Sequence, residues 1–279
     1  MNKVIILPPE PPIQTMMNHI FDRYRRLSTS CSIKGIPVDI KNCVRCCADS
    51  YFNGESEYTC ENFRKVYLIK YLAVQVEQIN WPIKVHLLSY IWEKSTLTAI
   101  SLGGGPGTEA IALINNLTDM ENFELTHDNV DAVDAWKTMY EDITHWFAKQ
   151  IEKVKLKTKF ISYDFTSASY NSDQLYDIVF VSWILSQINR GYRSRVLEIA
   201  RNLVKPQGYV LVTDRTQDTL VENITTILNE VDGLTWIKKE EQLRHNCGIT
   251  FPSDIKDDFQ VRILCNSTYW LLQSSGDEF

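Results

Sequence analysis

The sequence predicts an α/β fold with a mostly parallel sheet. Residues 97–117, LTAISLGGGPGTEAIALINNL, begin with an apolar run of strand length, pass through a glycine-rich turn and continue with apolar residues at helical spacing. Later in the chain, short apolar runs again alternate with amphipathic segments. Such alternation is typical of parallel sheets covered by helices. With 279 residues and 44% hydrophobic content, the chain can build one large domain and an additional segment.

Residues 1–95 are expected to form a mainly helical segment that also contains most of the cysteines. Residues 1–15 are rich in proline and are expected to be extended. Residues 16–28 have apolar side chains at helical spacing. The strand that opens the main domain follows this segment, so we expect a division into residues 1–95 and residues 96–279.

Two further helices are expected before the first strand of the main domain. Thr59 is a candidate N-cap for a helix that continues to about residue 79. Trp81 and Pro82 are expected to open another helix, because proline is tolerated in the first helical turn.

The cysteines between residues 31 and 60 raise the question of a metal site. They are Cys31, Cys43, Cys46, Cys47 and Cys60. Cys43 and Cys46 have the CxxC spacing that can bring two thiolates onto one zinc ion, and Cys60 could be a third ligand. No second close pair follows, so buried free thiols are favoured over zinc.

Composition favours a protein of a reducing compartment. The formal charge of −6 and the pI near 5.5 argue against a broadly basic surface that coats nucleic acid, although they allow a local basic groove. No apolar run approaches the roughly 20 residues that span a bilayer, and the start of the chain is a poor signal peptide. Seven cysteines, an odd number, do not suggest a disulfide scaffold. We expect a cytoplasmic protein, with the nucleus as the second choice, and no membrane partner.

The glycine turn at residues 103–107 indicates the kind of ligand. A dinucleotide-binding turn has its third glycine where this chain has Thr108. Glu109 at the start of the helix would repel a pyrophosphate and suits a ligand with an ammonium group. The phosphate-binding pattern GxxxxGK[ST] does not occur in the sequence, which excludes a P-loop nucleotidase.

This turn resembles the first motif of the class I S-adenosylmethionine (SAM)-dependent methyltransferases, a GxGxG sequence after the first strand. The resemblance covers residues 97–214. It implies a Rossmann-like, seven-stranded, mostly parallel sheet with helices on both faces, preceded by a helical N-terminal segment that covers the cofactor cleft. SAM is the implied cofactor, and the first motif would contribute cofactor-binding residues: Gly103, Gly104, Gly105, Gly107 and Glu109.

In this family an acidic residue at the end of the second strand binds both ribose hydroxyls. Residues 130–136, VDAVDAW, resemble that strand end, with Asp134 as the first choice and Asp131 as the second. Asp128 is a third choice, because residues 123–127 could be the strand instead. Alternatively, these aspartates cap the helix that follows.

Two further pairs of residues resemble motifs of this family. Asp164 and Phe165 follow a brief apolar run and correspond to the acid that accepts from the adenine amino group and the side chain that covers the ring. Ser182 and Trp183 end the strongest strand, and correspond to the fourth motif beside the transferred methyl. Trp183 either positions the acceptor or packs under the cofactor.

The rest of the chain completes the predicted sheet. The expected elements are a helix over 192–204, a turn over 205–208, a strand over 209–213, a helix over 216–232, and an antiparallel pair of strands over 234–238 and 259–272.

The resemblance implies transfer of a methyl group from SAM, but the sequence leaves the acceptor open. The [DN]-P-P-[FYW] motif of enzymes that methylate exocyclic amino groups is absent, and so is a cysteine nucleophile at the expected place. No catalytic base can be assigned. A small-molecule acceptor fits the acidic pI, whereas the tyrosine-rich segment VYLIKYLAV faintly resembles RNA- or ribosome-directed enzymes. The sequence is also compatible with a non-catalytic interaction module and, less well, with an NAD-linked oxidoreductase.

Overall fold

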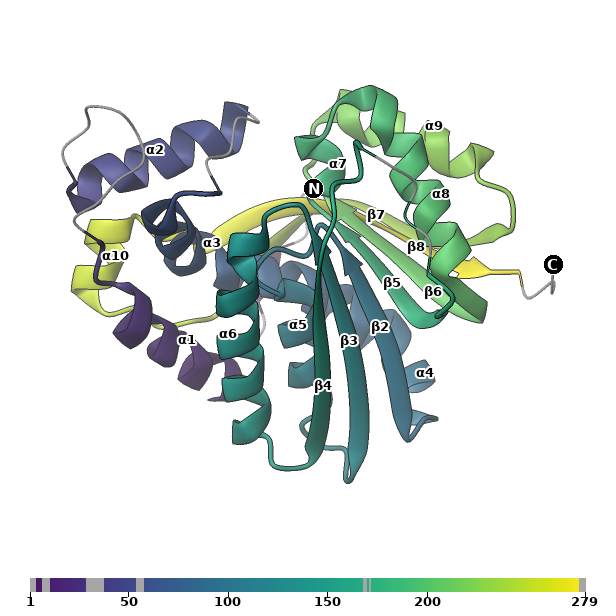
Figure 1. Cartoon of the computed structure of the whole chain (residues 1–279), viewed down its shortest axis with the longest axis horizontal. Helices are drawn as coiled ribbons and strands as arrows, with labels where there is room; N and C mark the ends of the chain where they lie inside the picture. Colours follow the sequence, from purple (N-terminus) through teal and green to yellow (C-terminus); the bar gives the residue numbers. More distant parts are fainter. Residues whose placement is uncertain are drawn as a thin grey trace.

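The computed structural model describes residues 4–6, 11–28, 38–53, 58–167, 170 and 172–275. Its centre is a sheet with the strand order β1-β7-β8-β6-β5-β2-β3-β4 (Figure 1). The strands are β1 (Val4–Ile6), β2 (Thr96–Leu102), β3 (Phe123–Asp131), β4 (Val154–Ser162), β5 (Tyr176–Ser182), β6 (Val204–Asp214), β7 (Leu234–Asn246) and β8 (Leu264–Ser274). Strand β8 is antiparallel to β6 and β7, and the other pairs are parallel. The predicted seven-stranded, mostly parallel sheet is confirmed, with the short strand β1 added beside β7.

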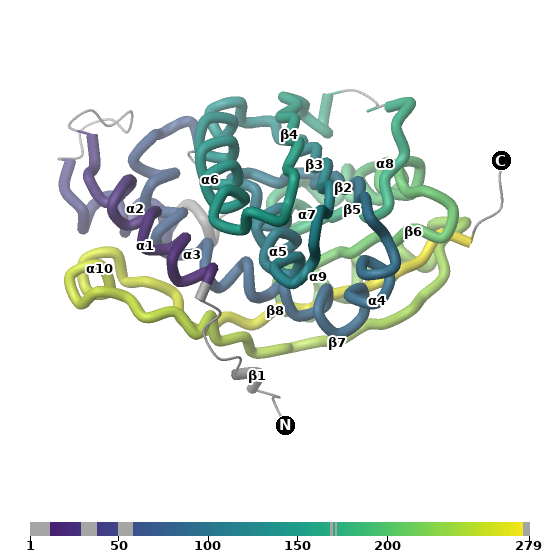
Figure 2. The backbone as a smooth tube through the Cα atoms, turned by 90° about the horizontal axis from the view of Figure 1, so that it is seen from below, coloured from purple at the N-terminus to yellow at the C-terminus, as the bar shows by residue number. Residues whose placement is uncertain are grey.

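Helices cover both faces of this sheet (Figures 1 and 2). They are α1 (Pro11–Tyr24), α2 (Ile40–Asn53), α3 (Glu61–Pro82), α4 (Leu88–Trp92), α5 (Thr108–Asn116), α6 (Lys137–Gln150), α7 (Ile184–Gln187), α8 (Arg193–Leu203), α9 (Asp218–Glu230) and α10 (Ser253–Phe259). None of the described helices is long and apolar enough to cross a bilayer.

Strand β5 shows why both faces are covered. Every residue from Tyr176 to Ser182 is buried. Because successive side chains of a strand point to opposite faces, Ile178 and Phe180 join one hydrophobic core, and Val179 and Val181 join the other. A strand that is apolar on both faces can only be stable in the middle of such a three-layer arrangement.

The N-terminal helices belong to one of these two cores. Side chains of α1, α2 and α3 share a continuous hydrophobic cluster with α5, α6 and one face of the sheet. The C-terminal helix α10 packs against α2 and α3, beside which it lies in Figure 1. The described helices of the N-terminal segment therefore pack on the sheet.

Helix α3 differs from the sequence prediction at both ends. Its N-cap is Cys60, which makes no side-chain capping bond, so the prediction of Thr59 as the cap is wrong. Pro82 does not open a new helix. It lies at the end of α3 and is followed without a break by a π-helix, Ile83–Leu87, and then by α4. The widened π turn accommodates the backbone next to a proline, which lacks the N–H that a regular helix needs.

Several strands also differ from the predicted bounds, among them β7, which continues to Asn246 instead of ending at residue 238. Strand β3 begins at Phe123, so residues 123–127 belong to it. Strand β6 begins at Val204, and the predicted turn is instead an irregularity inside the strand, where Gln207 has a φ of 62°. In the predicted strand over 259–272, Phe259 is the last residue of α10, and β8 begins only at Leu264.

Among the described residues, Cys43, Cys46, Cys47 and Cys60 form no disulfide bond. Cys43, Cys47 and Cys60 are buried, and burial raises the pKa of the Cys47 thiol. Among the described residues, no group of three or more His, Cys, Asp or Glu side chains is arranged to hold a metal ion. Cys31 lies outside the described residues.

Candidate functional site

The order of the strands reverses at β2, which lies between β3 and β5. At such a switch point the loops after neighbouring parallel strands separate and leave a crevice at their carboxyl ends. A cavity lies there, lined by residues that follow β2, β3, β4 and β5, and its empty volume is about 870 Å³ including space open to solvent. Ligand pockets fall in this size range.

The glycine turn after β2 forms one wall of this cavity. Gly105 has a φ of +47° and donates its N–H to Asp131 Oδ2 at 2.9 Å. A Cβ at Gly104 would lie 1.9 Å from Asn129 Oδ1. This contact leaves no room for a side chain, and Asn129 in turn donates to the Gly105 carbonyl at 2.8 Å. The turn is therefore fixed to strand β3 by two side chains, with Gly103, Gly104 and Gly105 lining the cavity.

Gly107 has a packing role instead of lining the cavity. It is the N-cap of α5 with a φ of +89°, and a Cβ there would lie 2.4 Å from the Tyr140 ring. The predicted contact between Gly107 and the cofactor does not fit this position, because the residue faces helix α6 rather than the cavity.

Glu109 is the most unusual residue of the site. It lies in the first turn of α5, lines the cavity and is 2% exposed. Its Oε2 and the Ser182 Oγ make no hydrogen bond of ordinary geometry with the described residues. Burial raises the pKa of Glu109 to about 7, and the nearby backbone and serine hydroxyls offset this only in part. A buried carboxylate oxygen without a partner is costly unless a ligand provides one.

Asp131 is the acidic residue at the end of the second strand of the main domain. It is the last residue of β3 and accepts from Gly105 N and, at 2.8 Å, from Val133 N. It lines the cavity, and burial raises its pKa to about 6 despite these two bonds. Each carboxylate oxygen keeps a further lone pair for a ligand hydroxyl.

The two other candidate aspartates lie elsewhere. Asp134, the first choice from the sequence, is exposed in a short 3₁₀ helix, Asp134–Trp136, and does not line the cavity. Strand β3 ends at Asp131, three residues before Asp134, so Asp131 is the acidic residue at the strand end. Asp128 is buried inside the strand, where its Oδ2 accepts from the Tyr176 hydroxyl at 2.7 Å.

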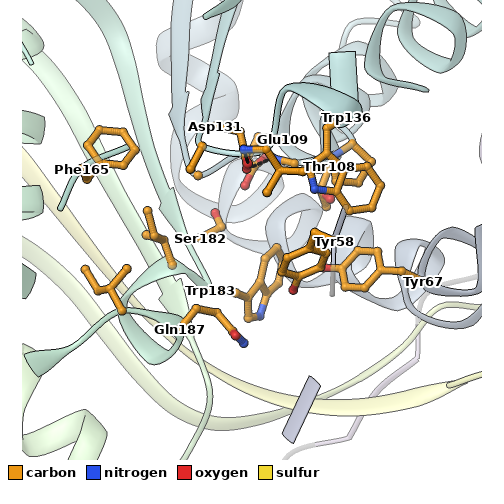
Figure 3. A pocket seen from close by; sticks show the side chains of 18 of the residues that line it. Tyr58, Tyr67, Thr108, Glu109, Asp131, Trp136, Phe165, Ser182, Trp183 and Gln187 are labelled. Carbon is orange, nitrogen blue, oxygen red and sulfur yellow. Dashed lines mark hydrogen bonds between the residues drawn. The ribbon is translucent and has the colours of Figure 1, made fainter. Parts of the chain in front are cut away.

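Asp164 and Phe165 lie at one end of the cavity, as Figure 3 shows for Phe165. The Phe165 ring is buried and packs edge-on against Tyr163 at a centroid distance of 5.3 Å. Asp164 Oδ1 accepts from the backbone and hydroxyl of Thr166, both at 2.8 Å. Both predicted residues therefore reach the cavity.

The other end of the cavity has an aromatic wall that the sequence did not predict. It consists of Tyr58, Tyr67 and Trp136, whose ring centroids lie 5.6 to 5.8 Å apart (Figure 3). Tyr58 and Tyr67 come from the N-terminal segment, which thus closes over the cavity. Only the tyrosine-rich sequence around residue 67 gave a signal for this wall.

Trp183 lies at the end of β5, next to Ser182, and both line the cavity. Its backbone has a φ of 57°, which is rare for a bulky side chain, and its N–H donates to the Thr213 carbonyl at 2.8 Å. Backbone strain of this kind persists where the surroundings hold it, and it is concentrated at functional sites.

The charged side chains among the described lining residues of the cavity are all acidic. Its described lining residues include the carboxylates of Glu109, Asp131 and Asp164, and no lysine, arginine or histidine is among them. Phosphate groups bind near basic side chains, so this cavity is poorly suited to a pyrophosphate. It suits a ligand with a cationic group, a diol and an aromatic ring.

Comparisons with known proteins agree on the fold. No protein-family model and no curated protein sequence matches this chain. Among solved structures, the chain is similar to a protein from Listeria monocytogenes assigned to the class I SAM-dependent methyltransferases, with a TM-score of 0.51, 8% identity, and coverage of 96% of this chain and 88% of that one.

Two further similar structures are magnesium protoporphyrin IX methyltransferase from Synechocystis with bound SAH and an rRNA methylase from Streptococcus thermophilus. The first has a TM-score of 0.47 and 13% identity over 85% of this chain and 100% of that one. The second has a TM-score of 0.42 and 9% identity over 67% of this chain and 93% of that one. The chain has the fold of the class I SAM-dependent methyltransferases.

Proposed function

We propose that the protein binds SAM in the carboxylate-lined cavity and transfers its methyl group to an acceptor. The observation that carries this proposal is the buried Glu109 carboxylate, whose Oε2 makes no hydrogen bond of ordinary geometry with the described residues, in a cavity with acidic and no basic described lining residues. SAM has an ammonium and a sulfonium group, and both match this charge.

The other lining residues fit the remaining parts of SAM. Asp131 Oδ1 and Oδ2 are held by two backbone N–H groups and can accept from the two ribose hydroxyls. Phe165 offers an aromatic surface for adenine at the end of the cavity, with Asp164 beside it. The glycines keep side chains out of the turn that the ligand would approach.

When bound, SAM supplies a methyl carbon whose bond to sulfur breaks as an acceptor lone pair forms the new bond, leaving a neutral thioether. The protein contributes mainly position and exclusion of water, because an in-line displacement needs the two reacting atoms aligned. The wall of Tyr58, Tyr67 and Trp136 closes the cavity to solvent on one side.

Ligand-dependent melting and methyl transfer test this proposal. A ligand of the native state raises the melting temperature, so SAM at about 1 mM should stabilise the protein and NAD should not. Transfer of labelled methyl from SAM into fractionated RNA, protein and small molecules then tests catalysis. Stabilisation by NAD alone would contradict the proposal and favour an NAD-linked oxidoreductase.

Asp131→Asn and Asp134→Asn form a matched pair for the ribose position. The two aspartates lie three residues apart, but only Asp131 lines the cavity. We expect SAM to stabilise the first variant less than the wild type and to stabilise the second as much as the wild type. Equal losses would contradict the assignment.

A further inference from the structure

A second hollow adjoins, at Trp183, the carboxylate-lined cavity that we propose binds SAM (the SAM cavity). Its described lining residues include Gln75, Trp183 and three arginines, Arg215, Arg244 and Arg262, and its empty volume is about 1240 Å³ including space open to solvent. Trp183 is the residue that lines both cavities. A group bound in the hollow therefore lies next to the Ser182 and Trp183 end of the SAM cavity.

Helix α3 also connects the two cavities. Tyr67 lines the SAM cavity, whereas Gln75, two turns later, lines the hollow. The Tyr67 hydroxyl donates to Gln75 Oε1 at 2.9 Å inside the buried part of the helix. Helix α3 and Trp183 thus contribute side chains to both cavities, so ligands bound in the two cavities would lie close to each other.

The hollow has the opposite charge from the SAM cavity. Three arginines line it, Arg215, Arg244 and Arg262, and none of its described lining residues is acidic. They come from different parts of the fold: the loop after β6, strand β7 and the segment before β8. In a chain with a net charge of −6, this local concentration of positive charge is not a property of the surface as a whole.

Asp214 is the carboxyl group next to Arg215 in sequence, and it does not line the hollow. It is fully buried as the last residue of β6, where it accepts from Ser186 N at 3.0 Å and Arg215 N at 2.8 Å. Burial raises its pKa, which disfavours its charged form. Arg244 and Arg262 are exposed to solvent and accessible to a ligand.

We propose that this hollow binds the methyl acceptor through a phosphate group of the acceptor; the inference rests on the proposed function for its role in methyl transfer. Guanidinium groups pair with phosphate oxygens through two parallel hydrogen bonds. A phosphate monoester has a charge of about −1.5 to −2 and three acceptor oxygens. A phosphate ligand can therefore pair with several arginines, whereas a carboxylate ligand has a single charge and only two oxygens. Thr216, Gln217 and Asn266 add neutral hydrogen-bonding groups.

Calorimetric titration of the full chain in the presence of SAM tests the proposal. The probes are inorganic phosphate, uridine 5′-monophosphate, a single-stranded RNA of about 12 nucleotides, and acetate as the carboxylate comparison. We expect a phosphate-containing probe to bind with a Kd below about 1 mM and acetate to bind at least tenfold more weakly. Tighter binding of the monophosphate indicates a small acceptor, and binding of RNA alone indicates a polynucleotide.

The double variant Arg244→Gln/Arg262→Gln removes the two exposed arginines. It should bind the phosphate probe at least about tenfold more weakly, with its melting temperature and SAM affinity unchanged. Arg45→Gln is the matched control, because Arg45 is an exposed arginine of α2 that lines neither cavity. Unchanged phosphate affinity in the double variant, or acetate binding equal to phosphate binding, would overturn the proposal.

These measurements keep the two proposals separable. Wild-type protein that binds SAM but no phosphate probe would refute the phosphate-binding hollow alone. Protein that binds phosphate through these arginines but not SAM would refute the methyl-transfer role, while the anion site itself would stand.

Discussion

The SAM cavity and the arginine-lined hollow share Trp183 but have opposite electrostatic character. One is lined by Glu109, Asp131 and Asp164 with no basic described residue, and the other by three arginines with no acidic one. The net charge of −6 is a sum over the whole chain and does not show this difference between the two cavities. Ligand chemistry is therefore decided by the few side chains around each cavity.

The largest effect is expected from Glu109→Gln, which removes the charge from the SAM cavity. A charge-assisted hydrogen bond contributes roughly 1.5 to 3 kcal/mol, so SAM affinity should fall about 10- to 100-fold. Anion binding in the hollow should not change. Calorimetric titration of both ligands checks this, and a variant that retains wild-type SAM affinity would remove the main support for the SAM site.

The same variant should make the ligand-free protein more stable at alkaline pH. Burial raises the pKa of Glu109 from 4.5 in the unfolded chain to about 7, so the folded state holds its proton more tightly, and stability is lost as the pH rises from about 4.5 to about 7. Glutamine is neutral and avoids this cost. Urea unfolding at about pH 8 should show a gain of roughly 1 to 2 kcal/mol over wild type, and a smaller gain at about pH 5.

The next largest effect on SAM affinity is expected from substitution of Asp131, which lines the SAM cavity, compared with Asp134, which does not. Asp131→Asn should weaken SAM binding about tenfold by removing a charged acceptor, and Asp134→Asn should leave it within about twofold. Titration calorimetry gives both values. Equal effects of the two substitutions would mean that the ribose position has been misassigned.

A change of pH should alter the ligand affinity of the SAM cavity about tenfold but leave that of the arginine-lined hollow unchanged. Because Glu109 must be ionised to pair with an ammonium group and its pKa is about 7, SAM affinity should fall about tenfold between about pH 8 and about pH 6. Sulfate binding at the arginines should remain constant, since neither partner titrates there. A sulfate affinity that changes in parallel with that of SAM would show that the two cavities are not independent.

The smallest effect is expected from salt. Raising the ionic strength from about 50 mM to about 300 mM should weaken anion binding at the exposed Arg244 and Arg262 severalfold. SAM binding should change by less than about twofold, because the buried Glu109 is poorly screened. Comparable salt dependence at both sites would argue against a buried ion pair in the SAM cavity.

The sequence was sufficient to predict the parts of the site that depend on local patterns. The strand, turn and helix at residues 97–117 combine two hydrophobic periods with a glycine turn, and those signals do not need tertiary contacts. Asp164, Phe165, Ser182 and Trp183 were placed by the family resemblance, and they lie at or just beyond the ends of β4 (Val154–Ser162) and β5 (Tyr176–Ser182). Nine of the eleven predicted cofactor-binding residues line the cavity, Gly107 and Asp134 being the exceptions.

Strand β3 shows why Asp131 was not the first choice. Its middle contains His127, Asp128 and Asn129, which are residue types typical of loops. In the structure each has a partner from another element: His127 contacts the hydroxyls of Ser101 and Tyr140, Asp128 accepts from the Tyr176 hydroxyl, and Asn129 donates to the Gly105 carbonyl. Such partners allow polar side chains inside a buried strand, and no local pattern indicates them.

The aromatic wall and the arginine-lined hollow depend entirely on tertiary packing. Tyr58 and Trp136 are far apart in the chain but have ring centroids 5.7 Å apart. Arg215, Arg244 and Arg262 likewise belong to separate segments that the strand order brings together. Residues scattered in this way have no spacing from which a site could be predicted.

A crystal structure of the protein with SAM would decide whether the buried carboxylates bind the methyl donor. We expect density in the carboxylate-lined cavity, with the ammonium group within hydrogen-bonding distance of Glu109, the ribose at Asp131 and the adenine against Phe165. Density in the arginine-lined hollow instead, or a SAM molecule that leaves Glu109 without a partner, would contradict the claim that the buried carboxylates define the methyl-donor site.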